Sequence, residues 1–404
     1  MSPPLHGRSG LRPGYVLFAA LFSAQAAILV LSPILPQVAD EFGVATATAA
    51  QLRSVSGMTA GVTALVLATR VNRFSVSSLL NRGLTLLGTG ALMSAWAPTF
   101  LVLLLAQIVI GFGLAAVLSG GLAASETWAA DGESAKVLSW ALIGQPVAWI
   151  IGQPVVGLVA GQNWRWAWIA VPFTASLVAL AAMRLRNPAI ADAGQECDPL
   201  GLWKQPGIKS WATAELLAFA AWAGTLVYAG AFFIETYDVS VGTTGLVLGL
   251  GAVFYLPGNA LGRRWLDRGT GLLMVGFSLA AAAAVLLFAT TDFSLTFSFL
   301  IFSVAVFFAA GRTIAGAAMG LEISHGRRLA AMSVRTSAAQ FGYLLGAGVG
   351  GLLLETWGFP GIGWGFGLLF AIAALTQLPR ALSHREAPES ARRFLRRHQP
   401  AAES

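Results

Sequence analysis

The chain has 404 residues, of which 56% are hydrophobic and only 11% are charged, and its mean hydropathy is +0.72. A soluble domain carries about 25% charged residues, because its surface has to be wetted. Most of this surface must therefore face lipid. The net charge of +7 does not indicate a nucleic-acid partner, because the basic residues sit in short loops between apolar runs instead of forming one patch. The single cysteine, Cys197, excludes a disulfide framework.

Twelve apolar segments are each long enough to cross a bilayer, which takes about 20 helical residues. In chain order they are residues 15–36, 48–68, 80–97, 100–124, 137–160, 166–184, 211–235, 243–262, 271–289, 293–320, 329–354 and 361–379.

The basic residues set the orientation of these segments, because lysine and arginine are retained on the cytoplasmic side of short loops. With the N-terminus inside, all but four of the 25 basic residues fall in inner segments. The outer loops hold only Arg165, and Arg53, Arg312 and Arg335 fall within spans. This partition predicts a multi-pass protein of the cell inner (plasma) membrane with both termini in the cytoplasm.

The longest inner connection, residues 186–209, divides six spans from six. We therefore expect an N-terminal six-helix bundle over residues 1–185 and a C-terminal six-helix bundle over residues 210–382. A basic cytoplasmic tail follows over residues 383–404.

The two halves echo one another at an offset near 195 residues. Gly152 and Gly157 in the fifth span correspond to Gly346 and Gly351 in the eleventh. Repeats of this kind imply two bundles with a site between them near the middle of the membrane, where rocking gives alternating access. The predicted fold class is thus an all-α membrane protein, with twelve transmembrane helices in two pseudo-symmetric bundles.

Several short motifs carry a family resemblance. The loop after the second span reads LATRVNR over residues 67–73, and the loop after the eighth reads GRRWLDRG over residues 262–269. Both resemble the signature loop of the major facilitator superfamily, roughly G-x-L-a-D-R-x-G-R, although Thr69 stands where the Asp is expected and Asn72 where the Gly is expected. GQPVVG over residues 152–157, followed by NWRW over residues 163–166, resembles the antiporter-type motif and outer loop of that superfamily's exporters. The fourth span matches the family's glycines, with Gln107 in place of the usual arginine. The overall likeness is to the twelve-span drug:proton antiporter and sugar-efflux group.

This resemblance implies a cytoplasmic gate of ion pairs between the signature loops and the ends of the fourth and tenth spans. Glu126 could pair with Arg70 or Arg73, and Glu322 with one of the arginines at positions 263, 264 and 268. The alternative is that these are solvated charges that only set orientation, since exposed pairs are worth about 0–1 kcal/mol. The expected gate comprises Arg70, Arg73, Glu126, Arg264, Asp267, Arg268, Glu322 and Arg335.

Four charged residues fall inside the predicted spans. An arginine at a helix centre costs about 2.5–3.5 kcal/mol, so it should face a cavity or a partner. Arg53, Arg335 and Glu215 lie shallow enough to reach the interface, whereas Arg312 lies deeper and is equally compatible with lining the cavity. Three arginines against one glutamate favour a neutral or anionic solute over a cation.

A proton-driven carrier needs a titratable group that meets each side of the membrane in turn. The four histidines lie in loops or tails, and the first span has no carboxylate in its interior. Glu215 is thus the hypothetical proton carrier, and its alternative role is to pair with Arg312 or Arg335.

In the family the first, fourth, seventh and tenth spans line the central path, assisted by the second, fifth, eighth and eleventh. Polar and aromatic residues on these spans are candidates for the cavity, although ordinary packing explains any one of them equally well. The candidates are Gln25, Arg53, Gln107, Gln145, Trp149, Trp222, Tyr228, Tyr255, Asn259, Arg312, Gln340 and Tyr343.

The leading interpretation is a secondary-active transporter that exports a small solute (drug-like, sugar-like or a metabolite) in exchange for protons. Its expected partners are that solute, protons and the lipid bilayer, and we expect a monomer with no cofactor or metal. An uptake symporter or facilitator of the same fold is the alternative. A receptor or scaffold is a third class, and an enzyme is disfavoured because convergent catalytic ligands are missing from the spans. No phosphate-binding G-x-x-x-x-G-K-[ST] loop is present.

Overall fold

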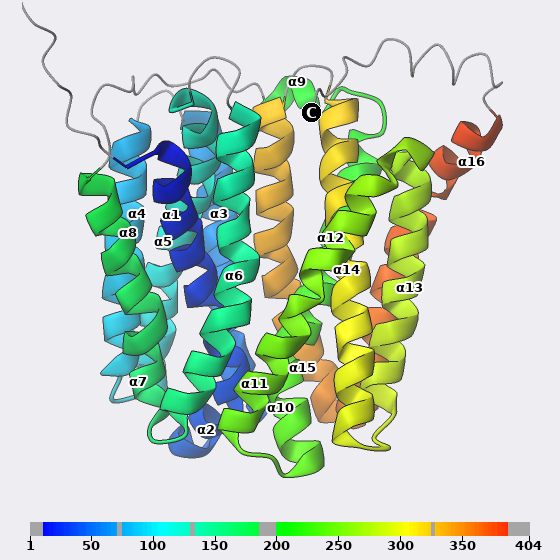
Figure 1. The fold of residues 1–404 in the computed structure, drawn as a ribbon. Coiled ribbons are helices and arrows are strands. Elements are labelled where there is room, and N and C mark those ends of the chain that lie inside the picture. The colour runs from blue at the N-terminus through cyan, green and yellow to red at the C-terminus, as the bar shows by residue number, and fades with distance from the viewer. Residues whose placement is uncertain (1–10, 71–74, 130–133, 186–198, 325–327, 387–404) are drawn as a thin grey trace, which may run out of the picture.

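A computed structural model describes residues 11–70, 75–129, 134–185, 199–324 and 328–386. Its helices run roughly side by side along one axis (Figure 1). Helix α1 begins at Pro13 on the face that also carries the C-terminal helix α16 (Leu378–Glu386), and we call this the terminal face. The other end of the bundle is the opposite face.

The first half of the chain forms one cluster of helices. These are α1 (Pro13–Leu29), α2 (Leu31–Phe42), α3 (Thr46–Arg70), α4 (Val76–Ala95), α5 (Phe100–Thr127), α6 (Ser134–Ala160), α7 (Trp164–Trp168), the π-helical turn η2 (Ile169–Phe173) and α8 (Thr174–Arg184). Helices α1 and α2 together make one pass, as do α7, η2 and α8.

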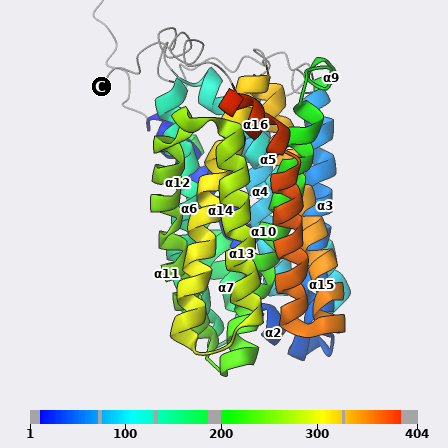
Figure 2. The same cartoon turned by 90° about the vertical axis from the view of Figure 1, so that its right-hand side faces the viewer.

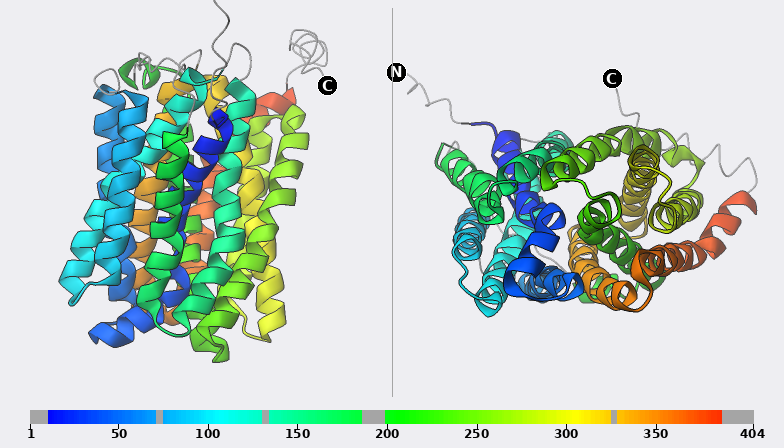
Figure 3. Two further views of the ribbon diagram at one scale, coloured as in Figure 1. Left: turned by 60° about the vertical axis from the view of Figure 1, so that its left-hand side comes forward. Right: turned by 90° about the horizontal axis from the view of Figure 1, so that it is seen from below.

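The second half forms a second cluster, which lies beside the first when the molecule is seen from the opposite face (Figure 3). After the short α9 (Pro199–Leu202) come α10 (Ile208–Tyr237), α11 (Val241–Val253), α12 (Tyr255–Arg264), η3 (Leu266–Arg268), α13 (Thr270–Thr290), α14 (Leu295–Ile323) and α15 (Arg328–Leu375). Helix α15 contains a non-helical residue, Gly358, whose φ of 63° divides it into two passes. Helix α16 packs against α13 at the terminal face (Figure 2).

The predicted layout of twelve spans agrees with this architecture. Nine helical stretches in the described ranges are long and apolar enough to cross a membrane, and the last, Ala330–Leu375, holds both passes of α15. Helices α3 and α4 complete the set, because they run through the bundle alongside the others (Figure 1). Their polar residues, such as Arg53 on α3 and Arg82 on α4, lower their mean hydropathy.

Some predicted ends differ from the observed ones. The first pass continues to Phe42, where Gly43 with a φ of 61° ends the helix. The sixth pass begins at Trp164, because Asn163 accepts a hydrogen bond from the Arg165 N–H and caps the helix there. The last pass ends at Leu375, and α16 is a separate helix.

The repeated glycines make matching contacts in the two halves. Gly152 on α6 packs against Leu29 of α1, and Gly346 on α15 packs against the backbone of α10 at Ala220. One turn further along each helix, Gly157 contacts α11 and Gly351 contacts α3. In each half, the first glycine of the pair therefore packs against a helix of its own half, and the second packs against a helix of the other half.

The two halves are held together toward the opposite face. The Ser32 hydroxyl donates to the carbonyl of Leu226 at 2.6 Å, and the Thr46 hydroxyl donates to Glu235 at 3.2 Å. At the seam between α6 and α11, the backbone of Gly157 lies so close to Gly245 that a Cβ on Gly157 would be 2.9 Å from the Gly245 Cα. Toward the terminal face α6 and α12 diverge (Figure 1).

We expect Gly157→Leu to destabilise the protein by about 1–3 kcal/mol, because the added side chain would overpack the α6–α11 seam. Gly276→Leu is the matched control, since a Cβ at Gly276 meets nothing within 4 Å. The measurement is the thermal unfolding temperature of the purified protein in detergent. Equal unfolding temperatures for the two variants would show that the seam is not closely packed.

Candidate functional site

A cavity lies between the two halves. Its walls come from α1, α5 and α6 of the first half and from α10, α11, α12, α14 and α15 of the second. Its empty volume is about 1070 Å³, counted with the space that is continuous with the outside. The cavity lies at the interface between the two repeated halves, where carriers built from such repeats place their solute site.

Seven of the predicted cavity residues do line this cavity, and together they offer amides and aromatic rings. They are Gln25, Gln145, Trp149, Trp222, Tyr255, Gln340 and Tyr343. Apolar side chains such as Leu226, Leu248 and Phe302 complete the wall.

The other predicted cavity residues lie elsewhere. Gln107 is buried between α4 and α5, where its Nε2 donates to the Ser94 hydroxyl at 3.2 Å. The Tyr228 hydroxyl donates to the carbonyl of Ala347 at 2.6 Å and joins α10 to α15. Asn259 on α12 is also outside the lining. Gln107 and Tyr228 follow the ordinary packing alternative, because each hydrogen-bonds to a neighbouring helix.

The structure adds lining residues that sequence reasoning missed: Phe219, Thr313 and Thr336. Two of them could have been found from helical spacing. Phe219 precedes Trp222 by three residues and Thr336 precedes Gln340 by four, so each shares a helix face with a predicted residue. Thr313 has no such signal, because the one predicted cavity residue of its span, Arg312, is its direct neighbour and so lies on a different helix face.

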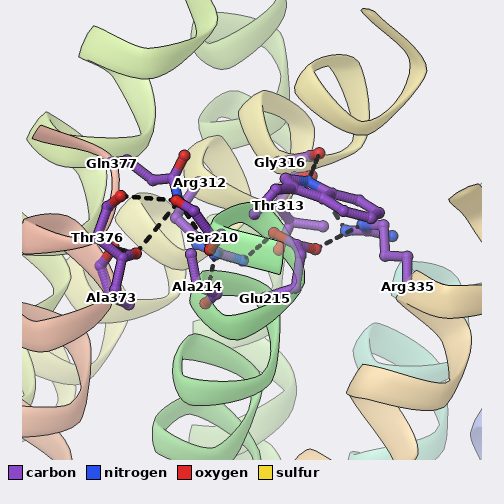
Figure 4. Close-up of polar contacts among 11 residues, drawn as sticks. Ser210, Ala214, Glu215, Arg312, Thr313, Gly316, Arg335, Ala373, Thr376 and Gln377 are labelled. Carbon is purple, nitrogen blue, oxygen red and sulfur yellow. Dashed lines mark hydrogen bonds and ion pairs between the residues drawn. The ribbon is translucent and has the colours of Figure 1, made fainter. Parts of the chain in front are cut away.

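Glu215 lies at the centre of a buried charge cluster in the second half (Figure 4). Its Oε1 is 2.6 Å from Nη1 of Arg312, and its Oε2 is 2.8 Å from Nε of Arg335. The residue is 0% exposed, and no other carboxylate whose side chain the structure describes is buried. The predicted pairing of Glu215 with Arg312 or Arg335 therefore occurs with both arginines at once.

Backbone groups hold the two arginines in place. Arg312 donates through Nη2 to the carbonyl of Ala214 at 2.8 Å, and Arg335 donates through Nη2 to the carbonyl of Thr313 at 3.1 Å. Gly316 makes room for the carboxylate, since a Cβ there would be 2.2 Å from Glu215 Oε1. The cluster joins α10, α14 and α15 at one point.

The roles of the two arginines differ from the predicted ones. Arg335, expected in the cytoplasmic gate, instead lines the cavity, with its side chain 19% exposed. Arg312, a candidate for the cavity lining, lies behind the wall and is only 2% exposed. A buried carboxylate attracts both guanidinium groups inward, so neither reaches an interface.

Arg53 on α3 is a second buried cation near the cavity. It is 1% exposed and donates to the Ser56 hydroxyl at 2.6 Å and to Oε1 of Gln340 at 3.3 Å. Its guanidinium lies 3.9 Å from the ring centroid of Tyr343. These contacts reach from the first half to α15 in the second. Arg53 therefore lies behind two lining residues, Gln340 and Tyr343, and reaches neither the cavity nor the membrane–water interface.

The predicted gate falls partly outside the described residues. Arg73 and the side chains of Arg70 and Glu126 are not described. In the second half, the carboxylate of Glu322 accepts a hydrogen bond from the Thr270 hydroxyl at 2.9 Å, and Arg268 lies over the Trp265 ring. Among the described side chains, no ion pair links Glu322 to Arg263, Arg264 or Arg268, and Asp267 is exposed.

The exporter-like loop at residues 163–166 has a structural role. Arg165 pairs with Glu41 at the end of α2, and its Nη1 donates to the carbonyl of Ala97 at 2.7 Å. The indole N–H of Trp164 also donates to Glu41. The loop thus ties together three chain segments of the first half at the opposite face.

We expect Glu215→Gln to lower the free energy of unfolding by about 3–5 kcal/mol, because the buried Arg312 and the partly buried Arg335 would lose the one carboxylate that pairs with them among the described side chains. The double variant Glu215→Gln/Arg335→Gln should recover part of this loss, since it removes one of the two unpaired charges. The measurement is unfolding by heat or denaturant in detergent.

Glu322→Gln is the control for this experiment. It alters an exposed carboxylate that contacts a neutral hydroxyl, so its stability should match that of the unmodified protein. If Glu215→Gln and Glu322→Gln were equally stable, the cluster would not hold the second half together.

Comparison with known proteins agrees with the fold. The family model of the major facilitator superfamily matches residues 17–306 and 212–402. A search of curated proteins finds no match. The chain resembles a crystal structure of a bacterial homologue of the human lysosomal transporter Spinster in an inward-facing and occupied conformation, with a TM-score of 0.70, 13% identity and coverage of 96% of this chain and 98% of that one.

An unoccupied inward-facing structure of a bacterial Spinster homologue is also similar, with a TM-score of 0.64, 14% identity and coverage of 96% of this chain and 99% of that one. The family model spans well over half of the chain, and both structures share its helical fold. The protein therefore belongs to the major facilitator superfamily and transports a small solute across a membrane by alternating access.

Proposed function

We propose that this transporter is a proton-coupled secondary-active carrier in which Glu215 binds the coupling proton. The observation that carries this proposal is the placement of Glu215 against Arg335, a residue of the cavity wall. A proton on Glu215 would therefore change the charge at the place where a solute binds.

The charged groups around Glu215 define what protonation would do. Arg312 faces it from α14 and Arg335 from α15. A neutral Glu215 would release Arg335 from its ion pair. The guanidinium could then donate to a hydrogen-bond acceptor on a solute.

In this geometry the proton and the solute would cross the membrane in the same direction. Protonation of Glu215 favours solute binding at Arg335, and by linkage solute binding at Arg335 favours protonation. Positive coupling of this kind is the basis of symport. The exporter-like motifs favour the other candidate, solute export in exchange for protons, which requires solute and proton to compete.

The membrane orientation follows from the distribution of basic residues. Exposed basic side chains on the terminal face include Arg184, Arg263 and Arg264, whereas Arg165 lies at the opposite face. By the positive-inside rule the terminal face would be cytoplasmic, in the inner (plasma) membrane. We further propose that the carrier works as a monomer, because each chain contains a complete cavity.

The sign of coupling can be measured in liposomes that contain the purified protein and an internal pH dye. The probes are naphthalene-1-sulfonate, neutral naphthalene-1-sulfonamide and (1-naphthylmethyl)trimethylammonium, each added outside at equal pH. We expect the lumen to become acidic as a probe enters, because the proton travels with it. Glu215→Gln should abolish the pH change, and Glu322→Gln should leave it intact.

Two results would refute proton coupling through Glu215. One is probe entry into liposomes with the unmodified protein without any change in lumen pH. The other is an undiminished pH change with Glu215→Gln. A lumen that becomes alkaline, and does so only while Glu215 is present, would retain Glu215 as the proton site and establish exchange in place of symport.

A further inference from the structure

Positive charge is in excess around the cavity. Arg335 is in the wall, and Arg53 and Arg312 are buried behind it. Among the carboxylate side chains that the structure describes, Glu215 alone is buried. It is shared by Arg312 and Arg335, so one positive charge of that cluster remains unbalanced.

Arg53 adds a second unbalanced charge. Its described contacts are the Ser56 hydroxyl, the Gln340 amide and the Tyr343 ring, all of which are neutral. Guanidinium groups do not deprotonate in proteins, and a buried charge without a counter-charge is costly. The excess cannot be relieved by losing a proton, so a bound anion would relieve it.

The wall offers suitable donors at one end of the cavity. The contacts of Arg335 with Glu215 and Thr313 engage two of its five N–H groups, so the guanidinium retains donors for a solute. Thr336 and Gln340 lie one and five residues further along the same helix and also line the cavity. The Thr336 hydroxyl already donates to the carbonyl of Met332 at 2.9 Å, so the polar group that continues the wall toward Arg53 is the Gln340 amide, whose Oε1 accepts from Arg53.

Apart from Gln25, Gln145 and Thr313, the rest of the wall is apolar and aromatic. Trp149, Trp222 and Phe302 face the cavity together with Leu226 and Leu248. Such surfaces bury hydrocarbon and aromatic ring faces. A solute that satisfies both regions has a compact apolar body and one negatively charged group.

We propose that the cavity binds an amphipathic organic anion, with an apolar or aromatic body between the tryptophans and one carboxylate-, sulfonate- or phosphate-type group at Arg335. This inference rests on the proposed function of a carrier that loads its solute in this cavity. It excludes lipophilic cations as substrates, because the two unbalanced charges would repel them.

Binding of matched probes tests the proposal. Naphthalene-1-sulfonate, naphthalene-1-sulfonamide and (1-naphthylmethyl)trimethylammonium share one ring system and differ mainly in charge. Isothermal titration calorimetry with the purified full-length protein in detergent gives their dissociation constants. We expect the sulfonate to bind at least about tenfold more tightly than the sulfonamide, and the ammonium probe not to bind.

Variants locate the anion. Arg335→Gln should abolish the sulfonate preference and Arg335→Lys should keep part of it, because the ammonium group retains the charge. Arg53→Gln should weaken sulfonate binding less than Arg335→Gln, since Arg53 lies behind the wall. Arg184→Gln, an exposed arginine at the end of α8, is the matched control and should bind like the unmodified protein.

The comparison of probes on the unmodified protein needs no variant, so a variant that fails to fold does not prevent the test. Equal or tighter binding of the sulfonamide or ammonium probe would overturn the proposal, as would no binding of any probe. A sulfonate preference that survives Arg335→Gln in a folded protein would also overturn it. Proton coupling is judged separately by the lumen pH measurement, so either proposal can fail while the other stands.

Discussion

The interior of the second half depends on one carboxylate that neutralises two guanidinium groups. Glu215 reaches Arg312 and Arg335 from α10, and through them it fixes the relative positions of α14 and α15. Nothing in lipid can solvate these charges, so the three helices must meet at this depth. Gly316 is required for the same reason, because a larger residue would occupy the place of the carboxylate. The cavity wall beside Arg335 is a product of this constraint.

The fold could be predicted from the sequence because lipid imposes a simple rule. A backbone that crosses hydrocarbon must satisfy its hydrogen bonds within each segment, so long apolar runs can be counted directly. The matched glycines were also readable, since close helix contacts need small residues. Gly157 and Gly351 do lie at contacts between the halves. Helix ends were harder to predict, because caps such as Asn163 extend helices beyond the apolar runs.

The site was only partly predictable, because hydropathy gives the depth of a residue but not the direction in which its helix faces. Gln107 and Tyr228 have the depth of cavity residues and yet point at neighbouring helices. Arg335 was predicted at the gate because its distance from the helix end allows it to reach water. Glu215 on α10 instead holds Arg335 at the cavity wall. The sequence does not reveal this contact, because the two residues are more than a hundred positions apart and meet only through helix packing.

The contact between Gly157 and Gly245 brings two main chains together without intervening side chains. At this seam the halves meet through main-chain atoms, whereas side chains form the wall of the cavity. Substitutions of side chains that reshape the cavity can therefore accumulate without altering this contact. Evolution can change the solute of such a carrier while the main-chain contact between its halves stays the same.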